Sequence, residues 1–131
     1  MYQKFKLRFQ EAEYHVNKEK RTVICVLKAD YDNELEYYTP SNFYNKYYKD
    51  YSYYFKSVGV AKCDPKDEFD ITLGKRIAES KAKRNAYKRY INIIRSFEKD
   101  LSKSIDIMRY NKSVMLDYIK KEEEHYKTLI Q

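Results

Sequence analysis

Eight Lys and Arg residues within the segment 71–95 are the side chains of this sequence best suited to chemistry. They are Lys75, Arg76, Lys81, Lys83, Arg84, Lys88, Arg89 and Arg95, and Glu79 is the only acidic residue of the segment. The flanking segments are balanced, with 12 basic and 12 acidic residues in 1–70 and seven of each in 96–131. Because neighbouring charges of one sign add their fields, the segment predicts an anionic partner.

Two of these arginines are expected on the apolar side of a helix. At about 100° per residue, Arg84 and Arg95 fall within about 40° of Leu73. A guanidinium in a core is unfavourable unless an anion meets it. Arg84 is therefore expected either to pair with an internal carboxylate or to bind a ligand phosphate through its planar fork of donors. The candidate carboxylates are Asp67, Glu98 and Asp106, and the other apolar residues of this side are Ile77, Tyr87, Ile91 and Ile94.

A second line of side chains repeats every seven residues and so stays on one side of a helix. It consists of Arg76, Lys83, Tyr90 and Phe97. Two cations followed by two rings suit a phosphate beside a base, because cations bind the oxyanions and a ring stacks on the base. A solvated basic face with two packing rings gives the same pattern.

No set of residues in the sequence indicates catalysis or a metal centre. His15 and His125 lie far apart, and the chain has no HExxH, CxxC or GxSxG motif. Cys25 and Cys63 lack metal-ligand spacing, and we expect two reduced, buried thiols rather than a disulfide. We therefore expect a protein that is not an enzyme and that uses no cofactor or metal.

The length and composition predict one α+β domain, 1–131. The chain has 131 residues and a mass of 16.0 kDa, which suits a single core. Residues 1–63 are expected to form an antiparallel sheet, and residues 70–131 are expected to be helical. The N-terminus has no apolar stretch of the signal-peptide type, and no run is long enough to span a membrane. We expect an intracellular protein of the cytoplasm.

Four strands are expected before the helical segment, at 4–9, 12–16, 22–27 and 53–62. The run 22–27 is continuously apolar and β-branched, which predicts a central strand covered on both faces. A turn is expected at 17–20. The segment 37–54 holds eight Tyr residues and Phe43. It is either an interaction surface or a meander whose rings pack on the sheet.

The segment 70–131 predicts long helix. Asp70 is expected as its N-cap and Phe69 as a staple residue. Unbroken, the helix would span about 87 Å. It is therefore expected to fold back, with Asp100 or Ser113 capping a second helix after breaks at 99–102 or 110–113, or to pack along other copies in a homo-oligomer. Apolar residues recur in alternating steps of four and three, as in a heptad repeat, at Leu73, Ile77, Tyr87, Ile91, Ile94, Leu101, Ile105, Met108, Met115, Ile119, Tyr126 and Leu129.

The junction between the expected sheet and helix resembles a known family. The stretches GVAKCDPKDEFD at 59–70 and LGKRIA at 73–78 are similar to the strand-to-helix junction of phage anti-Thoeris sponge proteins. The resemblance implies a non-catalytic phage protein that sequesters a cyclic ADP-ribose isomer, so inhibiting Thoeris antiphage defence in the bacterial host cytoplasm. Some members also bind cyclic oligonucleotides at a separate site, and members form dimers or hexamers.

The resemblance also implies the kind of pocket. In this family arginines and one aromatic ring come from helices beside a subunit interface. By residue type, Arg84, Arg95 and Arg109 match the pyrophosphate-binding arginines, and Tyr90 or Phe97 matches the ring that stacks on adenine. The segment 37–54 has no counterpart in the family.

Two other functions use the same basic segment. A small phage nucleic-acid-binding protein would spread the eight cations along backbone phosphates. A structural oligomer would present them to an acidic protein partner. Geometry separates the first from a sponge, because a sponge encloses Arg84 and Arg95 in a pocket whereas a nucleic-acid binder exposes most cations in one stripe.

Overall fold

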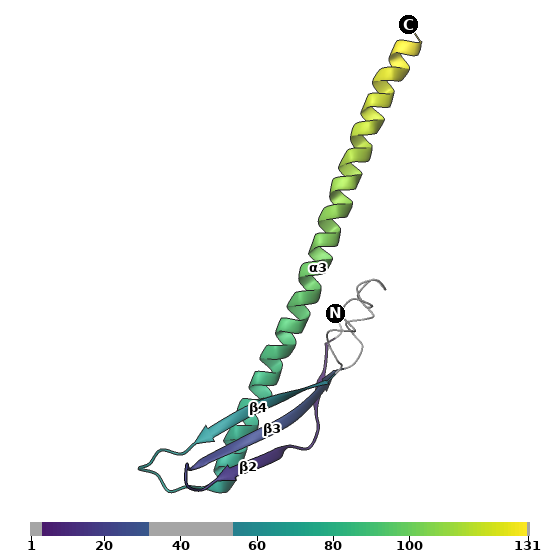
Figure 1. Cartoon of the computed structure of the whole chain (residues 1–131). Coiled ribbons are helices and arrows are strands. Elements are labelled where there is room, and N and C mark those ends of the chain that lie inside the picture. The colour runs from purple at the N-terminus through teal and green to yellow at the C-terminus, as the bar shows by residue number, and fades with distance from the viewer. Residues whose placement is uncertain (1–3, 32–53, 131) are drawn as a thin grey trace. The chain divides into compact units, whose positions relative to one another are not determined.

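The computed structural model describes residues 4–31 and 54–130 and has the expected α+β class (Figure 1). An antiparallel four-stranded sheet precedes one long C-terminal helix. The chain divides into two compact units, Met1–Arg95 and Ser96–Gln131. The elements are β1 (Leu7–Phe9), β2 (Glu13–Asn17), β3 (Thr22–Tyr31), β4 (Tyr54–Lys62) and α3 (Ile71–Leu129). The predicted Tyr-rich segment 37–54 lies outside the described residues except for Tyr54, which begins β4.

β3 is the central strand, as the sequence predicts. It pairs with β4 along one edge, and with β2 and β1 along its other edge. The turn before β3 is also confirmed, because the backbone N–H of Lys20 donates to Asn17 Oδ1 at 3.0 Å. Arg21 completes this turn with a φ of 54°, in the left-handed region that tight turns use.

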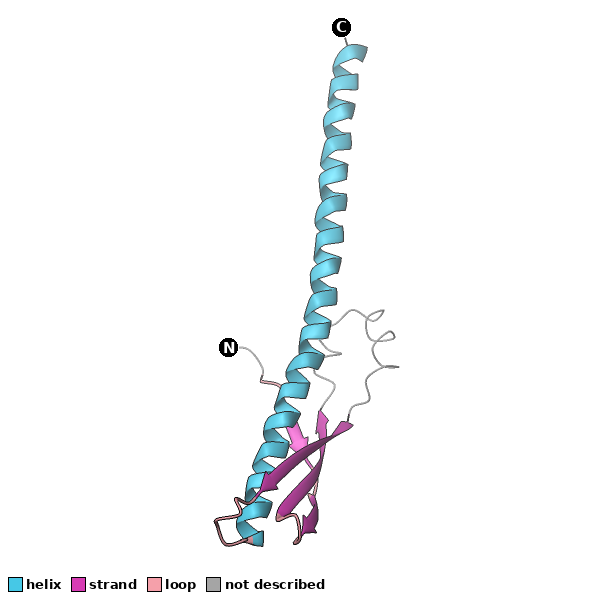
Figure 2. Cartoon of the chain, turned by 60° about the vertical axis from the view of Figure 1, so that its left-hand side comes forward, coloured by secondary structure: helices cyan, strands magenta, loops and turns pink. Residues whose placement is uncertain are grey.

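The sheet is covered on one face within the unit Met1–Arg95, where the first turns of α3 lie along it (Figure 2). Along β3, Val23, Cys25, Leu27, Ala29 and Tyr31 are buried on this inner face. Within residues 4–31 and 54–130 of one copy, the expectation that both faces are covered is wrong. The outer face carries a small apolar group, in which Ile24 pairs with Val60 and Val26 with Val58, and both β4 valines are exposed.

Small residues bring α3 close to the sheet. Ala78, Ala82 and Ala86, spaced four apart, are fully buried. Gly59 of β4 lies against this helix backbone so closely that a Cβ there would come within 2.1 Å of the Ala78 carbonyl oxygen. The Ser57 hydroxyl, also buried, donates to the Ala82 carbonyl at 2.7 Å. The helix packs through backbone contact, which only small side chains permit.

The junction 63–70 is built as a cap. Asp70 is the N-cap, as predicted, because its Oδ1 accepts from the backbone N–H of Leu73 at 3.1 Å. Asp64 Oδ1 accepts from the N–H of Lys66 at 2.9 Å. The Arg21 guanidinium donates to the carbonyl oxygens of Asp64 and Asp67, which fixes the loop to the turn before β3.

The two expected helix breaks are wrong, because α3 continues without interruption from Ile71 to Leu129. Asp100 and Ser113 therefore lie within the helix and cap nothing. The segment contains no Pro, and its single Gly, Gly74, is in the first turn. Asn111 also stays helical, with its amide donating to the Ile107 carbonyl one turn earlier at 2.9 Å. Polar residues at an exposed helix surface do not break the helix when the backbone bonds continue.

Candidate ligand-binding surface on the helix

Two cations and an amide of α3 are held by the edge of β4 that lies away from β3. Lys81 Nζ donates to the Val60 carbonyl at 3.1 Å, Asn85 to the Val58 carbonyl at 2.8 Å, and Arg89 to the Lys56 carbonyl at 3.2 Å. Four residues of helix rise about 6.0 Å, which nearly matches two residues of strand at about 6.7 Å. The three side chains therefore follow alternate carbonyls along the edge and cover it.

Two further cations lie over the rings of β1 and β2. Lys75 Nζ is 5.3 Å from the centre of the Tyr14 ring, and Lys83 Nζ is 5.7 Å from that of Phe9. Glu79, the only acidic residue of the basic segment, contacts one member of each of these pairs. It accepts from the Tyr14 hydroxyl at 3.0 Å and pairs with Lys83 at 3.4 Å. Burial, helped by the Glu79 carboxylate, raises the pKa of Tyr14.

Three cations remain available to a ligand. Arg76, Arg84 and Lys88 are exposed and make no hydrogen bond or ion pair with other residues of 4–31 and 54–130. The core-facing position expected for Arg84 is wrong, because the helix buries its alanine face and leaves the stripe of Leu73 outward. No ion pair joins Arg84 to Asp67, Glu98 or Asp106 within those ranges.

The other predicted ligand residues are divided between surface and core. Arg95 is exposed and donates to Asn92 Oδ1 at 3.4 Å, and Arg109 is exposed in the unit Ser96–Gln131. Tyr90 is 5% exposed, with its ring 5.1 Å from that of Tyr31. Phe97 is 8% exposed. The line Arg76, Lys83, Tyr90 and Phe97 is therefore not a continuous surface, because its cations are outside and its rings are buried.

The cations do not form one exposed stripe, and they do not enclose a pocket within the described residues of one copy. The hollow at the junction, about 370 Å³ in volume, has the wrong charge for an anion. Asp64, Asp67, Glu68 and Asp70 line it, against a single cation, Lys62. Residues of the stretches that carry the family resemblance thus line an acidic hollow, and Arg76, Arg84 and Lys88 are not among its lining residues.

Most of the large apolar residues of α3 are exposed, although the sequence predicted that those of the first turns face the core. Leu73, Ile77, Tyr87 and Ile91 were expected to face the core, yet each is at least 40% exposed. In the unit Ser96–Gln131, Ile105, Met108, Met115, Ile119, Tyr126 and Leu129 are more than 45% exposed. The spacing of four between Ala78, Ala82 and Ala86 was the signal for the true buried face.

Comparison of the chain with protein-family models, with curated proteins and with solved structures finds no match. Across the described ranges, no group of three or more His, Cys, Asp or Glu side chains is arranged to hold a metal ion. Both cysteines are free thiols, as predicted, but only Cys25 is buried, and Cys63 at the junction is partly exposed. None of the described helices has an apolar stretch suited to crossing a membrane.

Proposed function

We propose that this protein is a non-catalytic binder of a small phosphorylated nucleotide, acting as a homo-oligomer. The observation that carries the proposal is the group Arg76, Arg84 and Lys88, which leaves three exposed cations without partners among the described residues of a chain with net charge +7. Guanidinium groups that no carboxylate occupies are suited to bidentate binding of phosphate.

The specific ligand we propose is a cyclic ADP-ribose isomer, and the specific role is that of a phage sponge against Thoeris defence. The similarity of 59–70 and 73–78 to the junction of anti-Thoeris sponge proteins supports this identity. Because Arg84 and Arg95 are exposed in one copy, enclosing a ligand requires a second copy to cover this side of the helix. A sponge needs only to bind the signal tightly and to keep it from its receptor.

The experiment is to purify the protein from bacteria in which Thoeris defence is active, denature it by heat and identify released nucleotides by mass spectrometry. An intact cyclic ADP-ribose isomer, at a fixed ratio to protein, is expected. Arg76→Ala should lower the recovered nucleotide by at least tenfold, whereas the matched control Lys127→Ala should not. Hydrolysed nucleotide, formed in proportion to protein, would show an enzyme and overturn the proposal.

A nucleic-acid-binding role is the second candidate, and the exposure of Arg76, Arg84 and Lys88 favours it. Contacts to backbone phosphates release counterions, so affinity for a DNA duplex would fall steeply with salt. A logarithmic slope near −3, reduced toward −2 by Arg84→Ala, is the expected result for this candidate. Tight duplex binding with no released nucleotide would favour it over the sponge.

A further inference from the structure

The exposed stripe of α3 is a complete heptad seam. We use "seam" for the positions reached from Leu73 to Leu129 in alternating steps of four and three residues. Twelve of them are the apolar residues of the predicted stripe, and five are polar, Ser80, Arg84, Glu98, Lys112 and Glu122. The unit Met1–Arg95 buries the alanine face of the helix against its sheet and leaves the seam residues Leu73, Ile77 and Ile91 exposed. A strict heptad seam of this kind is the packing surface of a coiled coil.

The charges on the seam decide how a second copy can lie on it. In a parallel pair in register, each seam residue meets its own copy, so Arg84, Glu98, Lys112 and Glu122 would each face a like charge. Like charges at a helix interface are destabilising. A parallel pair displaced by two heptads brings Arg84 opposite Glu98, but this head-to-tail contact repeats without closing.

An antiparallel pair removes this conflict, and in one register it also brings opposite charges together. The seam positions face each other when their residue numbers add to 206, which places Arg84 opposite Glu122 of the second copy. Registers displaced by one heptad, with sums of 199 or 213, place Arg84 opposite Met115 or Leu129 instead. We propose that this chain forms a two-fold symmetric antiparallel coiled coil through the seam, with Arg84 paired to Glu122 of the second copy. The remaining facing pairs are Ile77–Leu129, Ser80–Tyr126, Tyr87–Ile119, Ile91–Met115, Ile94–Lys112, Glu98–Met108 and Leu101–Ile105.

One further observation supports this register. In this register the basic segment 71–95 of each copy lies against 111–131 of the other, a portion with four acidic and four basic residues, and Lys81 falls beside Glu123 of the second copy. An open, largely apolar hollow in the unit Ser96–Gln131 is lined by Met115, Tyr118, Ile119, Glu122, Glu123 and Tyr126. The proposed register brings Arg84, Tyr87 and Ile91 of the second copy onto that hollow. The inference does not depend on the nucleotide proposed above.

Charge reversal tests the pairing. Arg84→Glu and Glu122→Arg should each raise the dimer dissociation constant at least tenfold, measured by sedimentation at low salt. The two substitutions together in one chain should return it to within about threefold of the unmodified protein, because the pair is restored with its charges exchanged. Matched controls off the seam, Lys99→Glu and Asp106→Arg, should have less than half the effect. A double variant no better than the single variants overturns the register.

Disulfide trapping tests the orientation, in a Cys63→Ser background that leaves Cys25 buried. Mixing Ile91→Cys with Met115→Cys chains under mild oxidation should give the mixed 91–115 disulfide in preference to either like pair. Preference for 91–91 would show a parallel pair and overturn the proposal. A monomer at 100 µM in sedimentation would overturn it as well. Because neither assay contains nucleotide, their failure is distinguishable from failure of the ligand proposal.

Discussion

Substituting Gly59 with alanine tests how α3 is held on the sheet. A Cβ at this position would lie 2.1 Å from the Ala78 carbonyl oxygen, 2.4 Å from the Ala82 nitrogen and 3.0 Å from the Lys81 carbonyl carbon. All three atoms are backbone atoms of one helix, so no side-chain rotation relieves the overlap. The helix must move away from β4, and the fit of Ala78 and Ala82 on the sheet is lost.

Two terms set the size of the effect. Forcing an extra methyl group into a packed core lowers the free energy of unfolding by about 1–3 kcal/mol. Movement of the helix also weakens the buried 2.7 Å bond from Ser57 to the Ala82 carbonyl, and a buried polar group left without its partner costs about 1–3 kcal/mol. We therefore expect Gly59→Ala to destabilise the unit Met1–Arg95 by about 3 kcal/mol, which corresponds to a fall in Tm of about 12–24 °C.

The assay must report on the sheet, because helical circular dichroism also includes the segment 96–129. Alkylation of Cys25, which is fully buried in the core, reports opening of the sheet directly. Val60→Ala is the matched control, on the same strand but facing outward and 45% exposed, and should change the free energy by less than about 1 kcal/mol. If Gly59→Ala and Val60→Ala have equal effects, the close approach of helix and strand is refuted.

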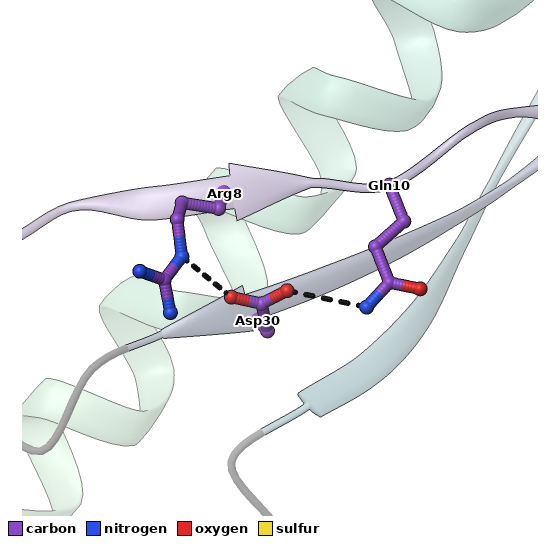
Figure 3. A network of polar contacts seen from close by, with 3 residues as sticks. All are labelled: Arg8, Gln10 and Asp30. Atoms are coloured by element: carbon purple, nitrogen blue, oxygen red, sulfur yellow. Dashed lines mark hydrogen bonds and ion pairs between the residues drawn. The ribbon is translucent and has the colours of Figure 1, made fainter.

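The remaining predictions concern charge, thiols and ligand. Hydrogen bonds from Arg8 and then Gln10 lower the pKa of Asp30 below its ordinary value (Figure 3). The pKa of Asp30 is lower in the folded than in the unfolded chain, so its stabilisation is present above the ordinary carboxyl range and is lost as pH falls through the folded pKa. Asp30→Asn should therefore flatten the rise of the free energy of unfolding with pH between about 2 and 5. The change should be less than about 1 kcal/mol, because Arg8 is largely exposed. Burial raises the pKa of the Cys25 thiol. Iodoacetamide at pH 8 should therefore modify Cys63 at least tenfold faster than Cys25. Equal rates would contradict the burial of Cys25 in the core. In the antiparallel register Arg95 falls beside Arg109 of the second copy, so a dinucleotide with two phosphates should tighten the dimer by threefold or more, and Arg95→Ala should abolish this response.

The sheet could be predicted from the sequence because its strands are locally encoded. The alternation in 4–9, the β-branched run 22–27 and the Asx turn at Asn17 each indicate structure from adjacent residues. β3 extends four residues past the predicted end, to Tyr31. In 28–31 the sequence changes to alternation, with Ala29 and Tyr31 inward and Lys28 outward, whereas in 22–27 the outward residues Ile24 and Val26 are also apolar.

The buried side of the helix could not be chosen by hydrophobicity alone. The seam is richer in large apolar residues than the alanine face, so the sequence favoured it as the core. The sheet instead takes the face that allows the closest approach, because Ser57, Gly59 and Ala61 of β4 leave room for a helix backbone but little for side chains. Complementary size between two distant segments decided the packing.

Whether a cation of the basic segment is bound by the sheet or exposed also depends on contacts between segments distant in the sequence. Sequence reasoning selected Arg84 because it falls on the apolar side of the helix, and it gave Lys81 and Arg89 no role beyond their part in the basic segment. Their difference arises from the edge of β4, whose carbonyl oxygens at Val60 and Lys56 accept from Lys81 and Arg89. The spacing Lys81, Asn85, Arg89 against alternate strand residues is a recognisable signal once the helix is known to run along that edge.

The concentration of positive charge in 71–95 therefore has two physical explanations that act together. Some of it stabilises the sheet, through the edge of β4 and the rings of β1 and β2. The remainder, Arg76, Arg84 and Lys88, lies on or beside the seam, where another copy or a phosphate must neutralise it if the surface is covered. In the antiparallel register Glu122 of the second copy would neutralise Arg84. The antiparallel pair would then use Arg84 for assembly and leave Arg76, Arg95 and Arg109 for the ligand. Arg84→Lys keeps the charge and should therefore preserve the dimer. The response of that variant to the ligand then reports on Arg76, Arg95 and Arg109.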